Sequence, residues 1–299
     1  MRFGDFCGEF FYLNPGILEM ATAIIAASTP AGVFLAADGL SYGDDQGVFT
    51  IVSKKQQKIF EITDERARFA FAITGTAAFT AEGDNKIIFN FNEVISRAAD
   101  ALKPFKFQDA TNYCERLART VNRMLKESVL AAKASGQKVT LPDNPDMDGQ
   151  GGGMIALLFM CGFYLQTSCY IAVKFFHRGG KLENPKTVLR VNLHQFIASG
   201  SGVVSNSLYS GGNDAEFSQF RHHSVAHPLT LSFEQLAEVA KDYVAACESP
   251  QGLAADPIFC PRIAGHVHAA SVTLNNGFRW ITGFEPLQPE SLSENLASL

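Results

Sequence analysis

The sequence has no excess of positive charge. Its 299 residues include 25 Lys and Arg against 30 Asp and Glu, which gives a formal net charge of −5. Because nucleic-acid binding depends on clustered Lys and Arg, this composition argues against a nucleic-acid partner. Charged residues are scarce at 18%, whereas 46% of the residues are hydrophobic. That balance excludes a disordered chain and indicates a globular protein with a large core.

Cysteine and tryptophan are also sparse. The six cysteines are widely scattered and form no C-x-x-C pair, so a disulfide framework is not expected. Reduced, mostly buried thiols in a cytoplasmic protein fit better. The chain has one Trp and seven Tyr against 25 Phe. Because Phe carries no polar group, most of these rings are expected in the interior.

Neither a signal peptide nor a membrane span is predicted. Met1 to Leu18 carries Asp5 and Glu9 among its apolar residues, which is not the pattern of a signal peptide. Met154 to Val173 has about the length of a membrane-spanning helix. However, a polar Gln-Thr-Ser tripeptide divides it, so two buried strands joined by a short turn are expected.

The histidines give only a weak indication of a metal site. His266 and His268 would point to the same face of an extended segment, and His222, His223 and His227 lie upstream. No Cys, His or carboxylate spacing accompanies them that would select a particular ion. We therefore predict neither a metal nor another cofactor.

The order of elements predicts a mixed α/β (α+β) protein in which two sheets lie between helical layers. A polar loop is expected from Gly39 to Gln57. Helical spacing covers Phe91–Leu102, Asp109–Ser135 and Ser232–Cys247, and a further helix is expected from Val203. The remaining apolar runs predict strands at Thr22–Ala27, Val33–Ala37, Lys58–Ile62, Arg68–Ile73, Met154–Leu165, Cys169–Phe176, Thr187–Ile197, His268–Leu274 and Phe278–Ile281.

Three short motifs carry a family resemblance. They are TAIIAASTPAGVFLAAD from Thr22 to Asp38, KIFEI from Lys58, and a strand ending in Gly75. Together they resemble the proteasome β-subunit and its simpler bacterial relatives, which are N-terminal-nucleophile (Ntn) hydrolases. Gly200-Ser201-Gly202 resembles the Gly-Ser-Gly turn of that family. The resemblance implies a four-layer αββα sandwich.

The resemblance also implies residue roles. Thr22 would become the chain terminus and the nucleophile, because its own α-amino group can then act as the base. Lys58 would tune the hydroxyl and the amine, and Asp38 would orient Lys58 and balance its charge. The Gly75 backbone N–H would donate to the oxyanion, and Ser201 would help to relay protons. The implied reaction is hydrolysis of a peptide or small amide substrate through an acyl-enzyme.

The sequence departs from the family pattern at two places. Ala21 stands at the processing site, where self-processing relatives usually carry Gly. In addition, Cys260 to Gly265 lacks the Asp and Ser that relatives carry before the last strand, and Asp256 is out of register with that pattern. The start of translation also affects processing. If translation began at Met20, removal of the initiator methionine would expose Ala21 and not Thr22.

Two functions are compatible with this resemblance. The first is a threonine hydrolase that removes residues 1–21 as a propeptide. The second is a non-catalytic ring or scaffold subunit that keeps its leading segment. A hydrolase domain is expected over 22–284, followed by a tail at 285–299. By resemblance, self-association into a ring and an ATP-dependent unfoldase partner are also expected.

Overall fold

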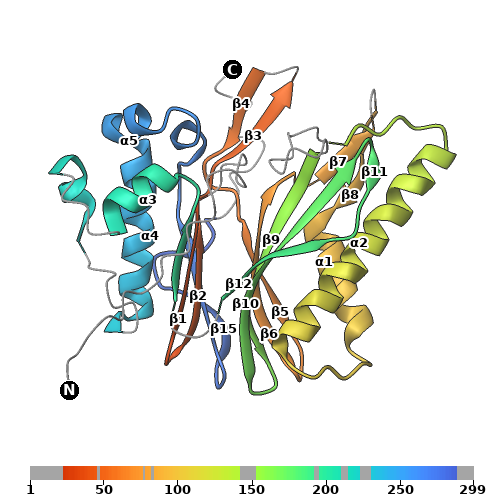
Figure 1. Cartoon of the computed structure of the whole chain (residues 1–299), viewed down its shortest axis with the longest axis horizontal. Helices are drawn as coiled ribbons and strands as arrows, with labels where there is room; N and C mark the ends of the chain where they lie inside the picture. The colour runs from red at the N-terminus through yellow and green to blue at the C-terminus, as the bar shows by residue number, and fades with distance from the viewer. Residues whose placement is uncertain are drawn as a thin grey trace.

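The structure is a computed structural model that describes residues 23–45, 48–76, 78–81, 84–141, 153–191, 195–209, 215–222 and 230–287. These residues form a mixed α+β protein with two larger antiparallel sheets and helices on both sides of the pair (Figure 1). Residues 1–22, and with them the whole predicted propeptide, lie outside the described residues, as do residues 288–299.

The first sheet has five strands in the order β13-β1-β2-β14-β15. Its strands are β1 (Ile24–Thr29), β2 (Gly32–Ala37), β13 (Phe196–Ser199), β14 (His268–Thr273) and β15 (Gly277–Trp280). All residues of β1 and β2 are buried, because helices cover one face and the second sheet covers the other. The predicted hairpin at the start of the chain is therefore confirmed from Ile24 onward.

The second sheet has six strands, with β11-β10-β9-β6-β5 in order and β12 also paired with β10. Its strands are β5 (Ile59–Thr63), β6 (Ala67–Gly75), β9 (Gly153–Tyr164), β10 (Thr167–Arg178), β11 (Lys181–Leu182) and β12 (Lys186–Val191). β9 and β10 pair along their length around the turn at Leu165 and Gln166. The apolar run Met154 to Val173 is thus two buried strands, as predicted. None of the described helices combines the length and apolar character needed to cross a membrane.

Two predictions about extended segments are wrong. The expected loop from Gly39 to Gln57 contains a hairpin of β3 (Ser41–Asp45) and β4 (Val48–Ser53). The predicted strand Thr187–Ile197 is two strands in different sheets, because β12 pairs with β10 whereas β13 pairs with β1. A second small hairpin, β7 (Ala78–Ala81) and β8 (Asp84–Asn90), was not predicted.

Helices cover the outer face of each sheet (Figure 1). α1 (Phe91–Leu102) and α2 (Ala110–Ala134) share a core with β6, β9 and β10. α3 (Gly202–Tyr209) and α4 (Phe233–Glu248) share a second core with β1, β2 and β14, and α5 (Pro250–Ala255) follows α4. A third apolar cluster lies between the sheets, where side chains of β1, β2 and β14 meet those of β5, β6, β9 and β10.

The predicted helix boundaries at α1, α2 and α4 agree with the structure because local capping determines them. The Asp109 side chain accepts a hydrogen bond of 2.8 Å from the Asn112 amide at the start of α2. At α4, Ser232 and Gln235 form a reciprocal capping box. Such side chains satisfy backbone amides that have no partner within the helix.

We expect Asp109→Ala to lower the free energy of unfolding by about 1 kcal/mol, because the Asn112 amide then loses its acceptor. Urea unfolding monitored by circular dichroism measures this change. Asp100→Ala is the matched control, since Asp100 lies in the last turn of α1 and is 67% exposed in its ion pair with Lys103. Equal destabilisation by the two substitutions would contradict the capping role.

Candidate active site

Three strands of the first sheet end or begin at the same level. Ile24, the first residue of β1, lies opposite Ser199 at the end of β13 and opposite Ala37 at the end of β2. Consequently Ala23, directly before β1, lies between the segments that follow β13 and β2. Those segments contain Ser201 and Asp38, which are 163 positions apart in sequence but flank the same point of the fold.

The Asp38 carboxylate is the centre of the first group of site residues. It is fully buried, and both of its oxygens accept hydrogen bonds. Oδ1 accepts from the Ala23 amide at 2.9 Å and from Lys58 Nζ at 3.1 Å. Oδ2 accepts from the amides of Leu40 at 3.2 Å and Ala264 at 3.4 Å. The carboxylate therefore joins four segments of the chain.

Lys58 and Asp38 form a buried ion pair. The Lys58 side chain is 10% exposed and that of Asp38 is 0% exposed. Burial raises the pKa of the Asp38 carboxyl, and the Lys58 ammonium and the backbone amides oppose that change. Since a buried ammonium or carboxylate alone is costly, each group needs the other. Asp38 and Lys58 thus contact each other, and the site roles assigned to them stay a prediction.

Gly75 lies at the same end of the second sheet as Lys58. β6 ends at Gly75, and β5 begins at Ile59, which pairs with Ala72 of β6. Gly75 is exposed and has a φ of 99°, a conformation that side-chain-bearing residues rarely adopt. Its backbone thus needs glycine, and the position it was assigned from sequence, at the end of a strand, is confirmed.

Ser201 has a carboxylate partner that the sequence pattern had placed out of register. Its hydroxyl donates to Asp256 Oδ2 at 2.6 Å, and both residues are buried. The other oxygen of Asp256 accepts from the amide of Phe259 at 3.0 Å. Asp256, which is out of register with the family pattern and was not predicted as a site residue, thus contacts Ser201. α5 ends directly before Asp256.

His268 lies beside the ion pair, and sequence reasoning considered it only as a weak metal candidate. It is the first residue of β14 and pairs with Ala37, next to Asp38. The ring is fully buried, and neither ring nitrogen has a hydrogen-bond partner among the described residues. Burial lowers the pKa of His268 from 6.5 to about 4, and the charges of His266 and Lys58 act in the same direction. The imidazole is thus neutral near pH 7.

The histidines that the structure describes do not assemble into a metal site. The rings of His266 and His268 lie 4.9 Å apart edge to face, but His266 Nε2 is 2.9 Å from the backbone oxygen of Glu285. His222 contacts Asp242 on α4 at 2.7 Å. Within the described residues, no group of three or more His, Cys, Asp or Glu side chains is arranged to hold a metal ion. His223 and His227 lie outside them.

Thr22 and Ala21, the predicted nucleophile and processing residue, also lie outside the described residues. Thr22 is nevertheless bonded to Ala23, whose amide donates to Asp38. Of the predicted site residues, the structure brings Asp38 and Lys58 into direct contact. Gly75 lies at the same end of the second sheet as Lys58, and Ser201 lies on the segment that flanks Ala23.

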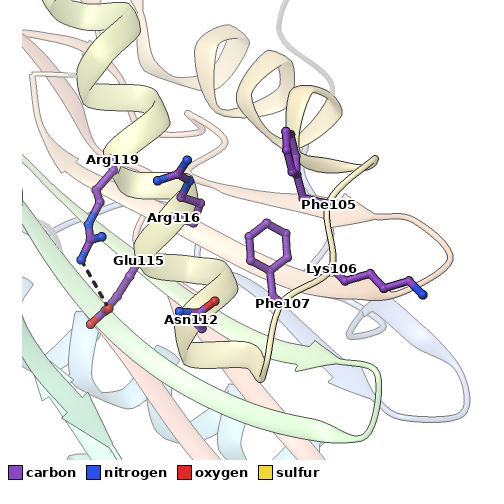
Figure 2. Close-up of a pocket in the computed structure, with 7 residues that line it drawn as sticks. All are labelled: Phe105, Lys106, Phe107, Asn112, Glu115, Arg116 and Arg119. Carbon is purple, nitrogen blue, oxygen red and sulfur yellow. Dashed lines mark ion pairs between the residues drawn. The ribbon is translucent and has the colours of Figure 1, made fainter.

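A hollow elsewhere on the chain contains none of these residues (Figure 2). Figure 2 shows it at the α1–α2 connection and the first turns of α2. Glu115 there forms ion pairs with Arg119, at 3.8 Å, and with Arg190 of β12. The lining residues are Phe105, Lys106, Phe107, Asn112, Glu115, Arg116 and Arg119. The hollow is formed by residues other than those of the candidate active site.

Comparison with known proteins identifies no family. No protein-family model matches the chain, and no curated protein matches it.

We expect His268 to make the protein less stable in acid. Its folded-state pKa of about 4 lies below the ordinary 6.5, so the unfolded state binds more protons between these values. The contribution of His268 to the free energy of unfolding should thus be unchanged above pH 6.5 and should fall by about 3 kcal/mol as the pH drops to 4. Urea unfolding of wild type and His268→Phe at several pH values measures this loss. Parallel profiles for the two proteins would contradict the assignment.

Proposed function

We propose that the chain is a threonine-type Ntn hydrolase with a four-layer αββα sandwich, in which Thr22 is the nucleophile. One observation carries this proposal. The buried Asp38 carboxylate binds both the Lys58 ammonium and the Ala23 amide, at 3.1 and 2.9 Å. The buried Asp38–Lys58 ion pair is costly to form, and it contacts Ala23, the residue that follows Thr22. Activation of a terminal threonine requires such a charged group next to it.

The chemistry starts from a free terminus at Thr22. Cleavage of the Ala21–Thr22 bond releases the α-amine, which takes the hydroxyl proton as Thr22 Oγ attacks the carbonyl carbon of an amide. The Gly75 N–H donates to the oxyanion. The C–N bond then breaks, the proton passes to the leaving amine, and an ester links the acyl group to Thr22. Water then adds to the carbonyl carbon of that ester, the bond to Thr22 Oγ breaks, the acyl group leaves as a carboxylic acid, and Thr22 Oγ regains its proton.

The surrounding residues have distinct tasks in this scheme. The Lys58 ammonium lowers the cost of negative charge on the attacking oxygen, and Asp38 holds the ammonium in place. Ser201 and Asp256 form a buried donor–acceptor pair on the other side of Ala23, and there they assist proton transfer at the amine. The proposed substrate is a peptide or small amide, with ring assembly and an unfoldase partner as further expectations.

The first test is whether Thr22 becomes the terminus. We expect purified wild-type protein to have the intact mass of a chain that starts at Thr22, and Thr22→Ser to be processed as well. Thr22→Ala should keep its full length, because the attacking hydroxyl is missing. If wild type and Thr22→Ala both keep residues 1–21, the self-processing hydrolase is rejected in favour of the scaffold subunit.

The second test concerns Lys58. A covalent threonine-directed electrophile should label processed wild type at Thr22, and Lys58→Ala should lower the labelling rate constant by about a hundredfold or more. Lys54→Ala is the matched control, since its side chain is 58% exposed in an ion pair with Glu248. Normal labelling of Lys58→Ala would refute the assigned role.

Lys58→Ala leaves the buried Asp38 carboxylate without its cation, which threatens folding. The double variant Asp38→Asn, Lys58→Met therefore accompanies it, because this variant has no buried charge at the pair. Circular dichroism establishes that each variant is folded. A folded double variant that labels at the wild-type rate would refute the role as well.

A further inference from the structure

The turn that carries Ser201 is closely enclosed. Gly200 has a φ of 120°, and a Cβ there would lie 2.9 Å from Ile263 Cδ1, 3.0 Å from Tyr243 Oη and 3.4 Å from Ala23 Cα. Both the backbone angle and the lack of space require glycine. The turn therefore lies between helix α4, which carries Tyr243, and the residue that follows Thr22.

Tyr243 holds this turn by its hydroxyl group. The hydroxyl is 3.0 Å from the Ser201 carbonyl oxygen and 3.4 Å from that of Ser199. It has one hydrogen to donate, so the shorter contact to Ser201 is the stronger one. The side chain is fully buried, and burial raises the pKa of Tyr243 well above its usual range. The hydroxyl thus stays protonated as a donor.

Hydrogen bonds hold both the backbone carbonyl and the side chain of Ser201. Its carbonyl oxygen accepts from Tyr243 and from the Ser205 amide, the latter at 3.0 Å. Its side-chain oxygen accepts from the Val204 amide at 3.2 Å and donates to Asp256 at 2.6 Å. Rotation of the Ser201 backbone would break the first pair of bonds and would turn the hydroxyl away from Asp256.

We propose that Tyr243 is a positioning residue of the candidate active site. By holding the Ser201 carbonyl, it keeps the Ser201 hydroxyl on Asp256 and the turn against Ala23. This inference rests on the proposed function, and it assigns to α4 a share in the site. Because Tyr243 acts through Ser201, its loss should affect the rate of reaction at Thr22 and not the capture of the reagent.

Tyr243→Phe tests the proposal, because it removes the hydroxyl and keeps the ring. Tyr209→Phe is the matched control. Tyr209 belongs to the same region, with its ring 6.2 Å from that of Tyr243, but its hydroxyl donates to the Val239 carbonyl of α4 at 3.1 Å. Each substitution deletes one hydrogen bond to a backbone oxygen, so the two variants should lose similar thermal stability.

Labelling by the threonine-directed electrophile separates the two variants. We expect Tyr243→Phe to lower the maximal labelling rate constant about tenfold, with little change in the reagent concentration that gives half of this rate. Tyr209→Phe should stay within about twofold of wild type. Equal labelling rates for the two folded variants would overturn the inference.

Hydrogen exchange tests the positioning role independently of the reaction. In Tyr243→Phe, the amides at positions 201–205 should exchange faster than in wild type, whereas Tyr209→Phe should leave them unchanged. Unchanged exchange in Tyr243→Phe overturns the positioning role. If the wild-type protein is never labelled, the proposed hydrolase is rejected instead. Faster exchange in Tyr243→Phe would even then support the role of Tyr243 in holding the Ser201 turn.

Discussion

The buried contact between Asp38 and Lys58 constrains the rest of this end of the molecule. A carboxylate with no solvent exposure must have its charge compensated and its oxygens hydrogen-bonded. Asp38 meets this demand with one ammonium and three backbone amides, from Ala23, Leu40 and Ala264. These donors come from the segments directly before β1, after β2, before β5 and before β14. The packing of four separate segments therefore depends on one carboxylate.

Strand register explains why such distant segments meet. Ile24 pairs with both Ala37 and Ser199, so β1 lies between the ends of β2 and β13. Antiparallel pairing fixes these partners residue by residue, and a shift by one would turn each buried side chain to the other face. The apolar core beneath α3 and α4 and the apolar cluster between the two sheets thus hold Asp38 and the Ser201 turn on either side of Ala23.

Local signals were enough to predict much of the fold. Asp109 and Ser232 determine where α2 and α4 begin, and the apolar runs give β2, β5, β6, β9 and β10 with small shifts at their ends. The β3–β4 hairpin was missed because β3 is polar and contains glycine, which hid the apolar, β-branched pattern of β4. The division of Thr187–Ile197 was missed because an apolar run does not reveal that its two halves belong to different sheets.

The candidate site likewise contains residues that could be predicted from the sequence and residues that could not. Asp38, Lys58 and Gly75 were predictable because each adjoins a strand with a clear apolar pattern, so their places on the sheets follow from short motifs. Asp256 and Tyr243 were not predictable, because their positions relative to Ser201 depend on how α4 and α5 pack on the first sheet. The Asp-Pro pair at Asp256 indicates only a turn.

The two sides of Ala23 are held by different kinds of interaction. On one side, the Asp38–Lys58 pair depends on opposite charges, so protonation of the carboxylate weakens it. On the other side, Ser201 is held by a neutral tyrosine hydroxyl, by backbone amides and by one carboxylate. Neutral hydrogen bonds change little with pH or salt, and they are directional. The Asp38–Lys58 ion pair is thus suited to tune the reactivity of an adjacent group, whereas the directional hydrogen bonds around Ser201 are suited to fix a geometry.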